Sequence, residues 1–329
     1  MTGALPRLHI GGDPRHGVTR YAQQLADALG AGVGQPEGGA GAGAAAHPHR
    51  RHLHFTDRLF GPDPDAAAAA VELLASGGPF SVTLHDVPQP SDGDEGLRLR
   101  SDAYRRVIDA AAGVVVNSEH ELRLLRRHTS RAARAAVIPL PVDPHPAADT
   151  VRVADPTVGV LGFVYPGKGH DRVIRAVAAL AGSAGVEVLG RASAGHEGDL
   201  SALATLAGSL GVGFTVTGYL SDDELLARSR QTTVPVIAHE HVSASGSLAS
   251  WLSAGRRPVV VSSPYMEEMA ELHGGSLTLT TADELPAAIA AALEDPSSTW
   301  LDDAARGRLG PDTGRVAALY REFWRGVAW

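Results

Sequence analysis

The chain of 329 residues contains no cysteine, which excludes a disulfide framework and a thiolate metal ligand or nucleophile. Aromatic residues make up only 5% of it, so the core must be built mainly from Ala, Val and Leu. The net charge of −8 argues against a general nucleic-acid binder, because such proteins carry a basic excess. Long apolar runs and a cleavage signal near the N-terminus are also lacking, so we expect a cytoplasmic protein without a membrane span.

Lysine is almost absent as well. The chain has 29 Lys and Arg residues, and Lys168 is the only lysine. It lies in LGFVYPGKGH, residues 161–170, after an apolar run and before a helical pattern. The start of a helix favours anions, flanking glycines let the backbone approach a ligand, and an ammonium suits a phosphate. The segment therefore predicts a phosphate site. A P-loop would need Ser or Thr after the lysine, where Gly169 stands, and a lysine that only caps the helix or points into solvent is the alternative.

Short apolar runs alternate with helical patterns along the whole chain, which predicts parallel sheets with helices on both faces. Strands are expected at residues 5–11, 52–57, 80–86, 113–118, 136–141, 157–163, 186–190, 214–219, 233–238, 258–261 and 276–280. Helices are expected at 16–29, 119–127 (capped by Ser118), 171–181, 200–210, 222–230, 284–293 and 315–324. A stretch rich in Pro, Ala and Asp, residues 141–156, divides the pattern into two halves with a cleft between them. Ligands of such sheets bind at the carboxyl ends of the strands.

Seven segments, in order along nearly the whole chain, resemble motifs of the GT-B glycosyltransferases of family 4, which are retaining enzymes that use nucleotide sugars. They are residues Gly11–Leu29, Val82–Asp86, Gly113–Glu121, Val137–Asp143, Leu161–Leu180, Gly218–Arg230 and Ser243–Val260. The resemblance implies an α/β fold of GT-B type with two Rossmann-like, doubly wound domains facing a cleft. Residues 1–148 would form the acceptor-side domain and residues 149–310 the donor-side domain. A C-terminal helix, residues 311–329, would cross back to the first domain.

The resemblance also implies a function. The protein would move a hexosyl group from a nucleoside-diphosphate sugar, UDP first and GDP second, to an acceptor hydroxyl, with retention and without metal or cofactor. Lys168 would contact the diphosphate, His85 the sugar, and Asp13 would orient the acceptor. Donor contacts would also come from Gly11, Gly12, Gly218, Tyr219, Glu240, His241, Ser243, Ser245, Gly246 and Ser247. The expected partners are the nucleotide sugar and a small or glycan acceptor, with no nucleic acid.

The chain departs from the family pattern at three positions. Phe163 stands where the family has a diphosphate-binding Arg, and Ser243 and Trp251 stand where it has two Glu residues. Arg256 and Arg257 are candidates to replace the lost Arg. These losses favour a second hypothesis, a catalytically silent GT-B partner or regulatory protein.

Other readings stay open at this stage. A nucleotide-sugar epimerase has the same fold, while a dehydrogenase would need a glycine spacing that the first loop lacks. The cluster His47, His49, His52 and His54 suggests a metal site but has no carboxylate at a motif spacing. The basic stretch Arg123–Arg134 suggests peripheral membrane contact, with a solvated helix face as the alternative. Asp13 and Asp86 lie in sequences that are also typical of turns.

Overall fold

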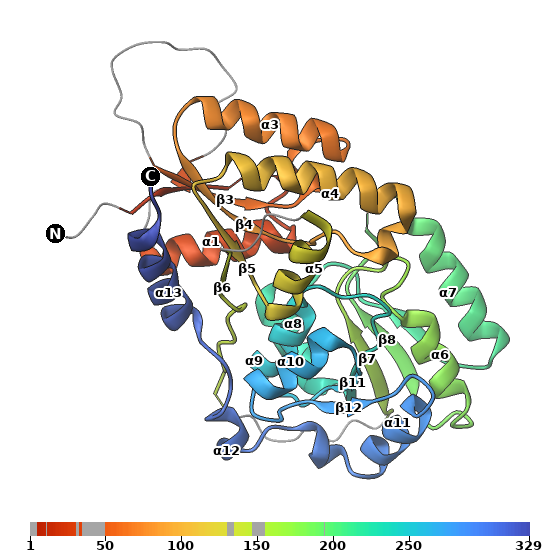
Figure 1. Cartoon of the computed structure of the whole chain (residues 1–329). Coiled ribbons are helices and arrows are strands. Elements are labelled where there is room, and N and C mark those ends of the chain that lie inside the picture. The colour runs from red at the N-terminus through yellow and green to blue at the C-terminus, as the bar shows by residue number, and fades with distance from the viewer. Residues whose placement is uncertain are drawn as a thin grey trace. The chain divides into compact units, whose positions relative to one another are not determined.

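The chain divides into two compact units in the computed structural model (Figure 1). Unit 1 contains Met1–Pro141 and Pro311–Trp329, and unit 2 contains Val142–Gly310. The structure describes residues 5–10, 12–30, 33–34, 50–129, 135–146, 155–193 and 195–329. The domain boundary expected after residue 148 falls outside these ranges. The last helix belongs to unit 1, as expected for a helix that returns to the first domain.

Unit 1 is built on a parallel sheet with the strand order β2-β1-β3-β4-β5-β6. The strands are β1 (Arg7–His9), β2 (Val33–Gly34), β3 (Arg51–Phe55), β4 (Phe80–Leu84), β5 (Gly113–Val116) and β6 (Ala136–Val137). Since the strands are parallel, their carboxyl ends share one edge of the sheet. The loops after β1, β3 and β4 therefore start from the same edge.

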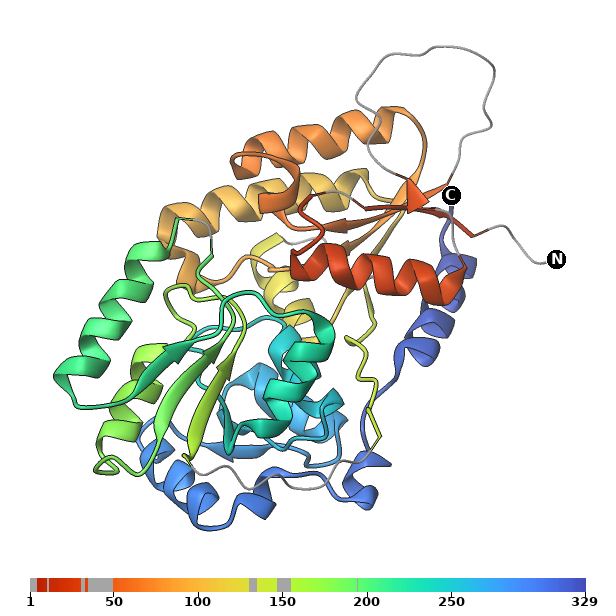
Figure 2. The ribbon, with the colours of Figure 1, turned by 180° about the vertical axis from the view of Figure 1, so that it is seen from behind.

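Helices cover both faces of this sheet. On one face α1 (Gly17–Leu29) packs beside α13 (Thr313–Gly326), and Figure 2 shows the two helices on the near side. The other face carries α2 (Asp57–Phe60), α3 (Pro64–Ser76), α4 (Gly93–Ala110) and α5 (Glu119–Thr129). A short 3-10 turn, η1 (Pro90–Asp92), precedes α4. The two faces thus have separate apolar clusters, which is the layering of a doubly wound domain.

Unit 2 repeats the plan with the strand order β12-β11-β10-β7-β8-β9, again all parallel. The strands are β7 (Thr157–Leu161), β8 (Gly185–Leu189), β9 (Phe214–Val216), β10 (Val234–Ile237), β11 (Val259–Val261) and β12 (Thr278–Thr280). Successive side chains alternate between the two faces, so Val234 and Val236 join one apolar cluster and Ile237 joins the other.

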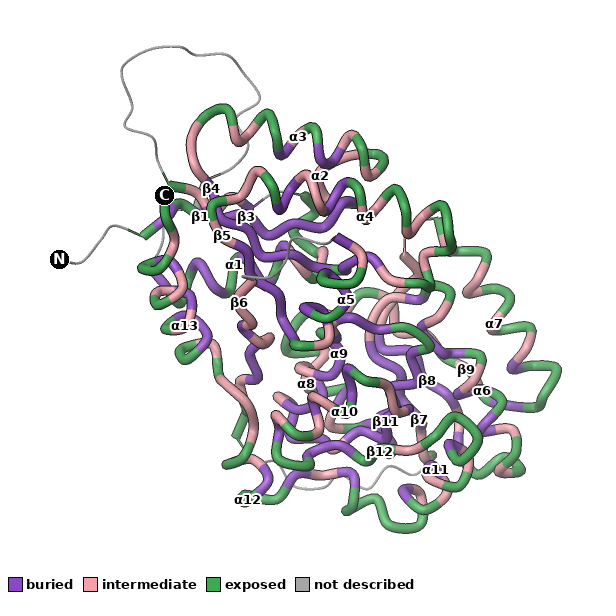
Figure 3. The backbone as a smooth tube through the Cα atoms, viewed as in Figure 1, coloured by how far each residue is buried: buried purple, intermediate pink, exposed green. Residues whose placement is uncertain are grey.

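One face of this second sheet carries α6 (His170–Ala178), α7 (Glu197–Ser209) and α11 (Leu285–Glu294). The other carries α8 (Asp222–Gln231), α9 (Gly246–Ser253) and α10 (Pro264–Leu272), with α12 (Asp303–Arg306) nearby. A 3-10 turn, η3 (Pro296–Thr299), follows α11. Figure 3 shows the central strands of both units as mostly buried chain between partly exposed helices.

The strands named from the sequence are confirmed, with ends shifted by a few residues. The cap is also confirmed, because the Oγ of Ser118 accepts a hydrogen bond of 3.0 Å from the N–H of Glu121. Trp251, which stands where the family has a Glu, is fully buried and packs in the apolar core of unit 2. The helices α3 and α4 went unpredicted, although Asp63 caps α3 and Pro64 opens it. No helix in the described part of the chain is long and apolar enough to cross a membrane.

Candidate functional site

A glycine-bent loop follows β7 and holds Lys168. Gly162, Gly167 and Gly169 all have positive φ, which glycine adopts most readily. A Cβ at Gly169 would lie 1.9 Å from the carbonyl oxygen of Ala238, so this loop presses against the end of β10. The helix α6 begins at His170, so Lys168 lies in the turn that precedes the helix.

The ammonium of Lys168 is buried, with 7% of the residue exposed. Its Nζ donates a hydrogen bond of 3.3 Å to the Oγ of Ser247 and lies 5.7 Å from the ring centroid of Tyr165. No carboxylate among the described residues lies within ion-pair distance of it. Burial lowers the pKa of Lys168 to about 8. A solvated or merely capping lysine does not fit this environment.

The start of α9 lies against this ammonium. Ser245 is the N-cap, and its Oγ accepts from the N–H of Leu248 at 3.2 Å and contacts the Oγ of Ser247 at 3.1 Å. The N–H of Ser245 donates to the hydroxyl of Tyr265 at 3.0 Å. N–H groups of a first helical turn have no partner within the helix and favour an anion. Ser243, Ser245 and Ser247 are buried, while Gly246 is exposed.

Two buried histidines neighbour Lys168. Burial, and then the charge of Lys168, lower the pKa of His170 to about 3, and the same causes with His170 added lower the pKa of His239 far below its ordinary value. Both rings are therefore neutral at pH 7. The Nε2 of His170 and the Nδ1 of His239 are buried without a hydrogen-bond partner in the described part of the chain. Lys168 thus provides the positive charge of this cluster.

The predicted donor residues Glu240 and His241 are exposed at the same edge. The N–H of Glu240 donates to the carbonyl of Gly167 at 2.9 Å, which ties this segment to the lysine loop. The carboxylate of Glu240 pairs with Arg172 at 3.4 Å. Of the predicted residues in unit 2, the structure therefore brings together Lys168, Glu240 and the serines at the start of α9.

Gly218 and Tyr219 follow β9, the edge strand, which is two strands away from β7. Gly218 has a φ of 77°, and the carbonyl oxygen of this glycine accepts from the hydroxyl of Thr217 at 3.0 Å. Tyr219 is 51% exposed. These residues share the carboxyl edge with Lys168, but no contact joins the two groups in the described structure.

A second cation at this edge was missed by the sequence reasoning. Arg191 follows β8, and its guanidinium carbon lies 5.4 Å from the ring centroid of Phe163 at the end of the neighbouring strand β7. The Nε of Arg191 is buried and has no hydrogen-bond partner in the described structure. The only signal in the sequence was an Arg after the run Val186–Gly190, which does not reveal its neighbour.

The expectation that Arg256 or Arg257 replaces the lost Arg is wrong. Arg256 is fully buried and donates to the carbonyls of Ser229, Thr232, Thr233 and Thr299 at distances of 2.5–3.2 Å. The carbonyls of Ser229, Thr232 and Thr233 lie before β10 and that of Thr299 lies in η3, at the amino edge of the sheet, which is opposite to Lys168. The Nη1 of Arg257 donates to the carbonyl of Gly275 at 2.8 Å, also before a strand. Both guanidinium groups therefore stabilise the fold.

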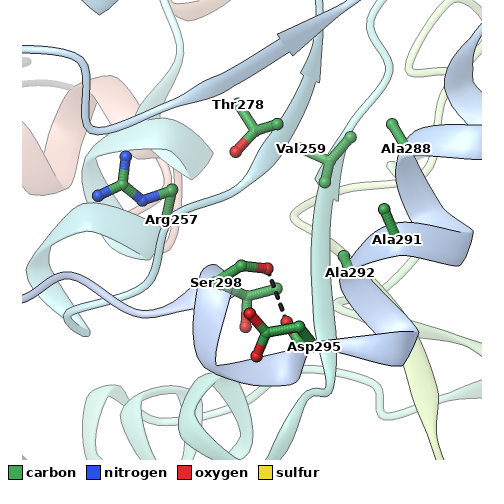
Figure 4. A pocket seen from close by; sticks show the side chains of 9 residues that line it. Arg257, Val259, Thr278, Ala288, Ala291, Ala292, Asp295 and Ser298 are labelled. Atoms are coloured by element: carbon green, nitrogen blue, oxygen red, sulfur yellow. Dashed lines mark hydrogen bonds between the residues drawn. The ribbon is translucent and has the colours of Figure 1, made fainter.

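A pocket of about 330 Å³ lies at the same amino edge (Figure 4). Its lining includes Val259 and Thr278, which are the first residues of β11 and β12, and three alanines of α11. It lies at the opposite edge of the sheet from the lysine loop. This hollow therefore does not mark the candidate site.

In unit 1, His85 directly follows β4 and is buried. The next residue, Asp86, has a φ of 48°, which is strained for a residue with a Cβ. The hydroxyl of Tyr104 donates to the carbonyls of His85 and Asp86 at 2.5 and 3.1 Å, and Arg100 donates to the carbonyl of Asp86. These contacts hold the strained turn and thereby the His85 ring.

The first loop places its predicted residues in an exposed turn. The Oδ1 of Asp13 accepts from the N–H and the Nε of Arg15 at 2.9 and 3.2 Å. His16 caps α1, because its Nδ1 accepts from the N–H of Val18 at 3.3 Å. Gly12 has a φ of 90° and lies close to Leu59, and Gly11 lies outside the described residues. The acceptor-orienting role of Asp13 stays a prediction.

The histidine patch is a buried hydrogen-bonded cluster where the structure describes it. His52 and His54 have ring centroids 5.1 Å apart, and their ring nitrogens contact Ser81, Thr83 and His85. Among the described residues, no group of three or more His, Asp or Glu side chains is arranged to hold a metal ion. His47 and His49 lie outside the described residues.

Comparison with known proteins gives a family match for part of the chain and a fold match for nearly all of it. Residues 45–145 match the model of Glycosyltransferase Family 4. The fold of the whole chain is similar to that of HepE from Anabaena in complex with UDP and glucose, with a TM-score of 0.78 and 17% identity over 98% of this chain and 100% of that chain. The fold is that of a GT-B glycosyltransferase. Residues 45–145 of this GT-B chain carry the family 4 match and include His54 and His85.

Two further solved structures share the GT-B fold. Sucrose-phosphate synthase from Thermosynechococcus elongatus has a TM-score of 0.75 and 16% identity over 98% of both chains. A UDP-forming α,α-trehalose-phosphate synthase from Burkholderia xenovorans has a TM-score of 0.64 and 12% identity over 86% of this chain and 75% of that chain. A search of curated proteins by sequence found no match. At identities this low, the structural similarity establishes the fold alone. The reaction must be argued from the site.

Proposed function

We propose that this protein transfers a hexosyl group from a nucleoside-diphosphate sugar to an acceptor hydroxyl, with retention of configuration and without a metal. UDP is the first candidate for the nucleotide and GDP the second. The observation that carries the proposal is the buried ammonium of Lys168, which has no described carboxylate partner and contacts Ser247 at the start of α9. A buried cation without a counterion is costly, so a bound anion explains its presence.

The chemistry follows from the leaving group. As the bond between the sugar's anomeric carbon and the phosphate oxygen breaks, negative charge grows on the departing diphosphate. Lys168 and the N–H groups at the start of α9 are already in place to stabilise this charge, and burial of Lys168, Ser245 and Ser247 strengthens the electrostatic interaction. The acceptor oxygen forms the new bond on the same face, and its proton passes to the diphosphate. This route needs no protein nucleophile.

Arg191 is the candidate for a second diphosphate contact. It follows the strand next to β7, and a Cβ at Gly190 would lie 2.0 Å from the carbonyl oxygen of Gly162. A Cβ at Gly162 would in turn lie 3.2 Å from the Nζ of Lys168. Lys168 thus lies beside Gly162, whose carbonyl faces the backbone of Gly190, the residue before Arg191. A guanidinium binds phosphate through two parallel hydrogen bonds, which would complement the point charge of the lysine.

The choice of nucleotide has support from the comparisons. The HepE structure is that of a complex with UDP and glucose, and the trehalose-phosphate synthase is described as UDP-forming. A catalytically silent binding protein is the second candidate, because Ser243 and the fully buried Trp251 supply no carboxylate where the family has its Glu pair.

The two functions are separated by one set of measurements. UDP, GDP and ADP are titrated into the wild-type protein and Lys168→Met, and the shift in melting temperature is recorded. At 100 times Kd a nucleotide should stabilise the wild type by about 2.7 kcal/mol, and Lys168→Met by much less. Release of UDP from UDP-glucose with a panel of acceptors then supports transfer. Binding without release supports a silent protein that has kept the donor site. No binding of any nucleotide contradicts the transferase and favours a catalytically silent GT-B partner or regulatory protein.

A further inference from the structure

His54 and His85 form a stacked pair in unit 1. They come from the neighbouring strands β3 and β4, with His54 in register with Thr83 and His85 directly after the end of β4. The Nδ1 of His54 lies 3.2 Å from the Nε2 of His85, and the rings are 5.4 Å apart at 24°. The ring of Tyr21 is nearly perpendicular to both rings, with centroids 5.2 and 5.8 Å away.

Each ring carries one proton at neutral pH. Burial is the main cause that lowers the pKa of His85 to about 4, and it lowers the pKa of His54 well below its ordinary value. Asp86 and His16 are the other groups that act on His85, and they act in opposite directions. In a neutral pair, one of the two facing nitrogens must be the donor and the other the acceptor.

The far side of the His54 ring decides which arrangement holds. Its Nε2 is buried and has no hydrogen-bond partner in the described part of the chain. A buried N–H without an acceptor is rarer and costlier than a lone pair without a donor. The proton of His54 therefore belongs on Nδ1, from where it is donated to the Nε2 of His85. His85 must then carry its own proton on Nδ1.

We propose that His54 is a positioning residue that holds His85 in the Nδ1–H form, so that His85 offers a fixed hydrogen-bond donor to an oxygen of the bound sugar. This inference rests on the proposed function. The contact to His54 is the one hydrogen bond that the His85 ring makes within the described structure. Since its Nε2 is engaged by His54, His85 acts as a donor and takes no proton from the acceptor hydroxyl.

His52, on the same strand as His54, has a different role. The Nε1–H of Trp324 can only donate, and it lies 3.3 Å from the Nδ1 of His52. His52 must therefore be protonated on Nε2, which donates to the hydroxyl of Thr83 at 2.9 Å. That hydroxyl contacts the hydroxyl of Tyr320 at 2.7 Å. His52 thus ties α13 to the sheet and makes no hydrogen bond or ring contact with His85 within the described structure, which makes it a matched control.

The first test needs no substrate. Nitrogen NMR of the histidine side chains in the full-length protein at pH 7 should show a neutral His85 with its proton on Nδ1. In His54→Leu this form should be lost, whereas His54→Asn retains an N–H donor near the same place and should preserve it. His52→Asn should lower the melting temperature and leave the form of His85 unchanged. A proton on Nε2 of His85 in the wild type, or a charged ring, would overturn the proposal.

The second test is kinetic. His54→Leu should lower kcat for transfer from the nucleotide sugar roughly 10–100-fold, as expected for a lost orienting partner, with little change in KM. His54→Asn should recover most of kcat. A loss of equal size in His52→Asn would reduce His54 to a structural role and reject the proposal. If the wild type transfers no sugar, the proposed function fails, while the NMR result still decides the state of the pair.

Discussion

UDP affinity should fall about tenfold between pH 7 and pH 9, because Lys168 loses its proton in this range. The pKa of Lys168 is about 8 in the free protein, against an ordinary value of 10.5. About nine tenths of the lysines are therefore charged at pH 7 and about one tenth at pH 9. A bound diphosphate restores the ordinary pKa, so binding above pH 8 must first add a proton. The ratio of charged fractions gives a loss of about 1.4 kcal/mol.

The two histidines beside Lys168 and the phosphates of UDP contribute little to the change in affinity between pH 7 and pH 9. His170 and His239 are already neutral at pH 7, since their pKa values are lowered by burial and by Lys168. The last ionisation of UDP has a pKa near 6, so about nine tenths of the nucleotide is fully ionised at pH 7 and nearly all of it at pH 8 and 9. The slope between pH 7 and pH 9 therefore reports Lys168.

Isothermal titration calorimetry at pH 7, 8 and 9 and constant ionic strength measures this slope. Near pH 8 the wild type should also take up about half a proton per nucleotide, which appears as a dependence of the enthalpy on the buffer. Lys168→Arg keeps its charge at every pH and should show neither effect. A flat affinity in the wild type, or an equal slope in Lys168→Arg, would refute the reasoning.

Three further outcomes follow. Lys168→Met should raise the free energy of unfolding of the unliganded protein at pH 7 by about 1–3 kcal/mol, because the pKa of Lys168 is lower in the folded than in the unfolded state. This gain should shrink as pH rises from 8 to 10.5, and a lower melting temperature at pH 7 would contradict it. Gly169→Ala should destabilise by at least about 2 kcal/mol more than Gly182→Ala, which has a similar φ and open space, and equal melting temperatures would count against the close approach to β10. Arg191→Ala should weaken UDP about tenfold and uridine little, as measured by calorimetry, while the exposed Arg175→Ala should match the wild type; equal losses for UDP and uridine would exclude a phosphate contact.

Local patterns in the sequence determined most of the strands, because buried parallel strands read as short apolar runs bounded by turns. They also pointed to Lys168, which stands out as the only lysine and is flanked by glycines. The cap at Ser118 followed from the same local chemistry. The helices α3 and α4 were missed although their start signals are local. The sequence therefore contained the information needed to predict these two helices.

Only the tertiary structure decided which side chains meet. His54 reaches His85, and Arg191 reaches Phe163, because β3 lies beside β4 and β7 beside β8. Arg256 reads like a surface cation but is buried against carbonyls at the opposite edge of its sheet. The burial that lowers the pKa of Lys168 likewise depends on segments far away in the chain. A sequence determines the local backbone and the face that each residue occupies, whereas distances between neighbours depend on strand order and register, which long-range packing sets.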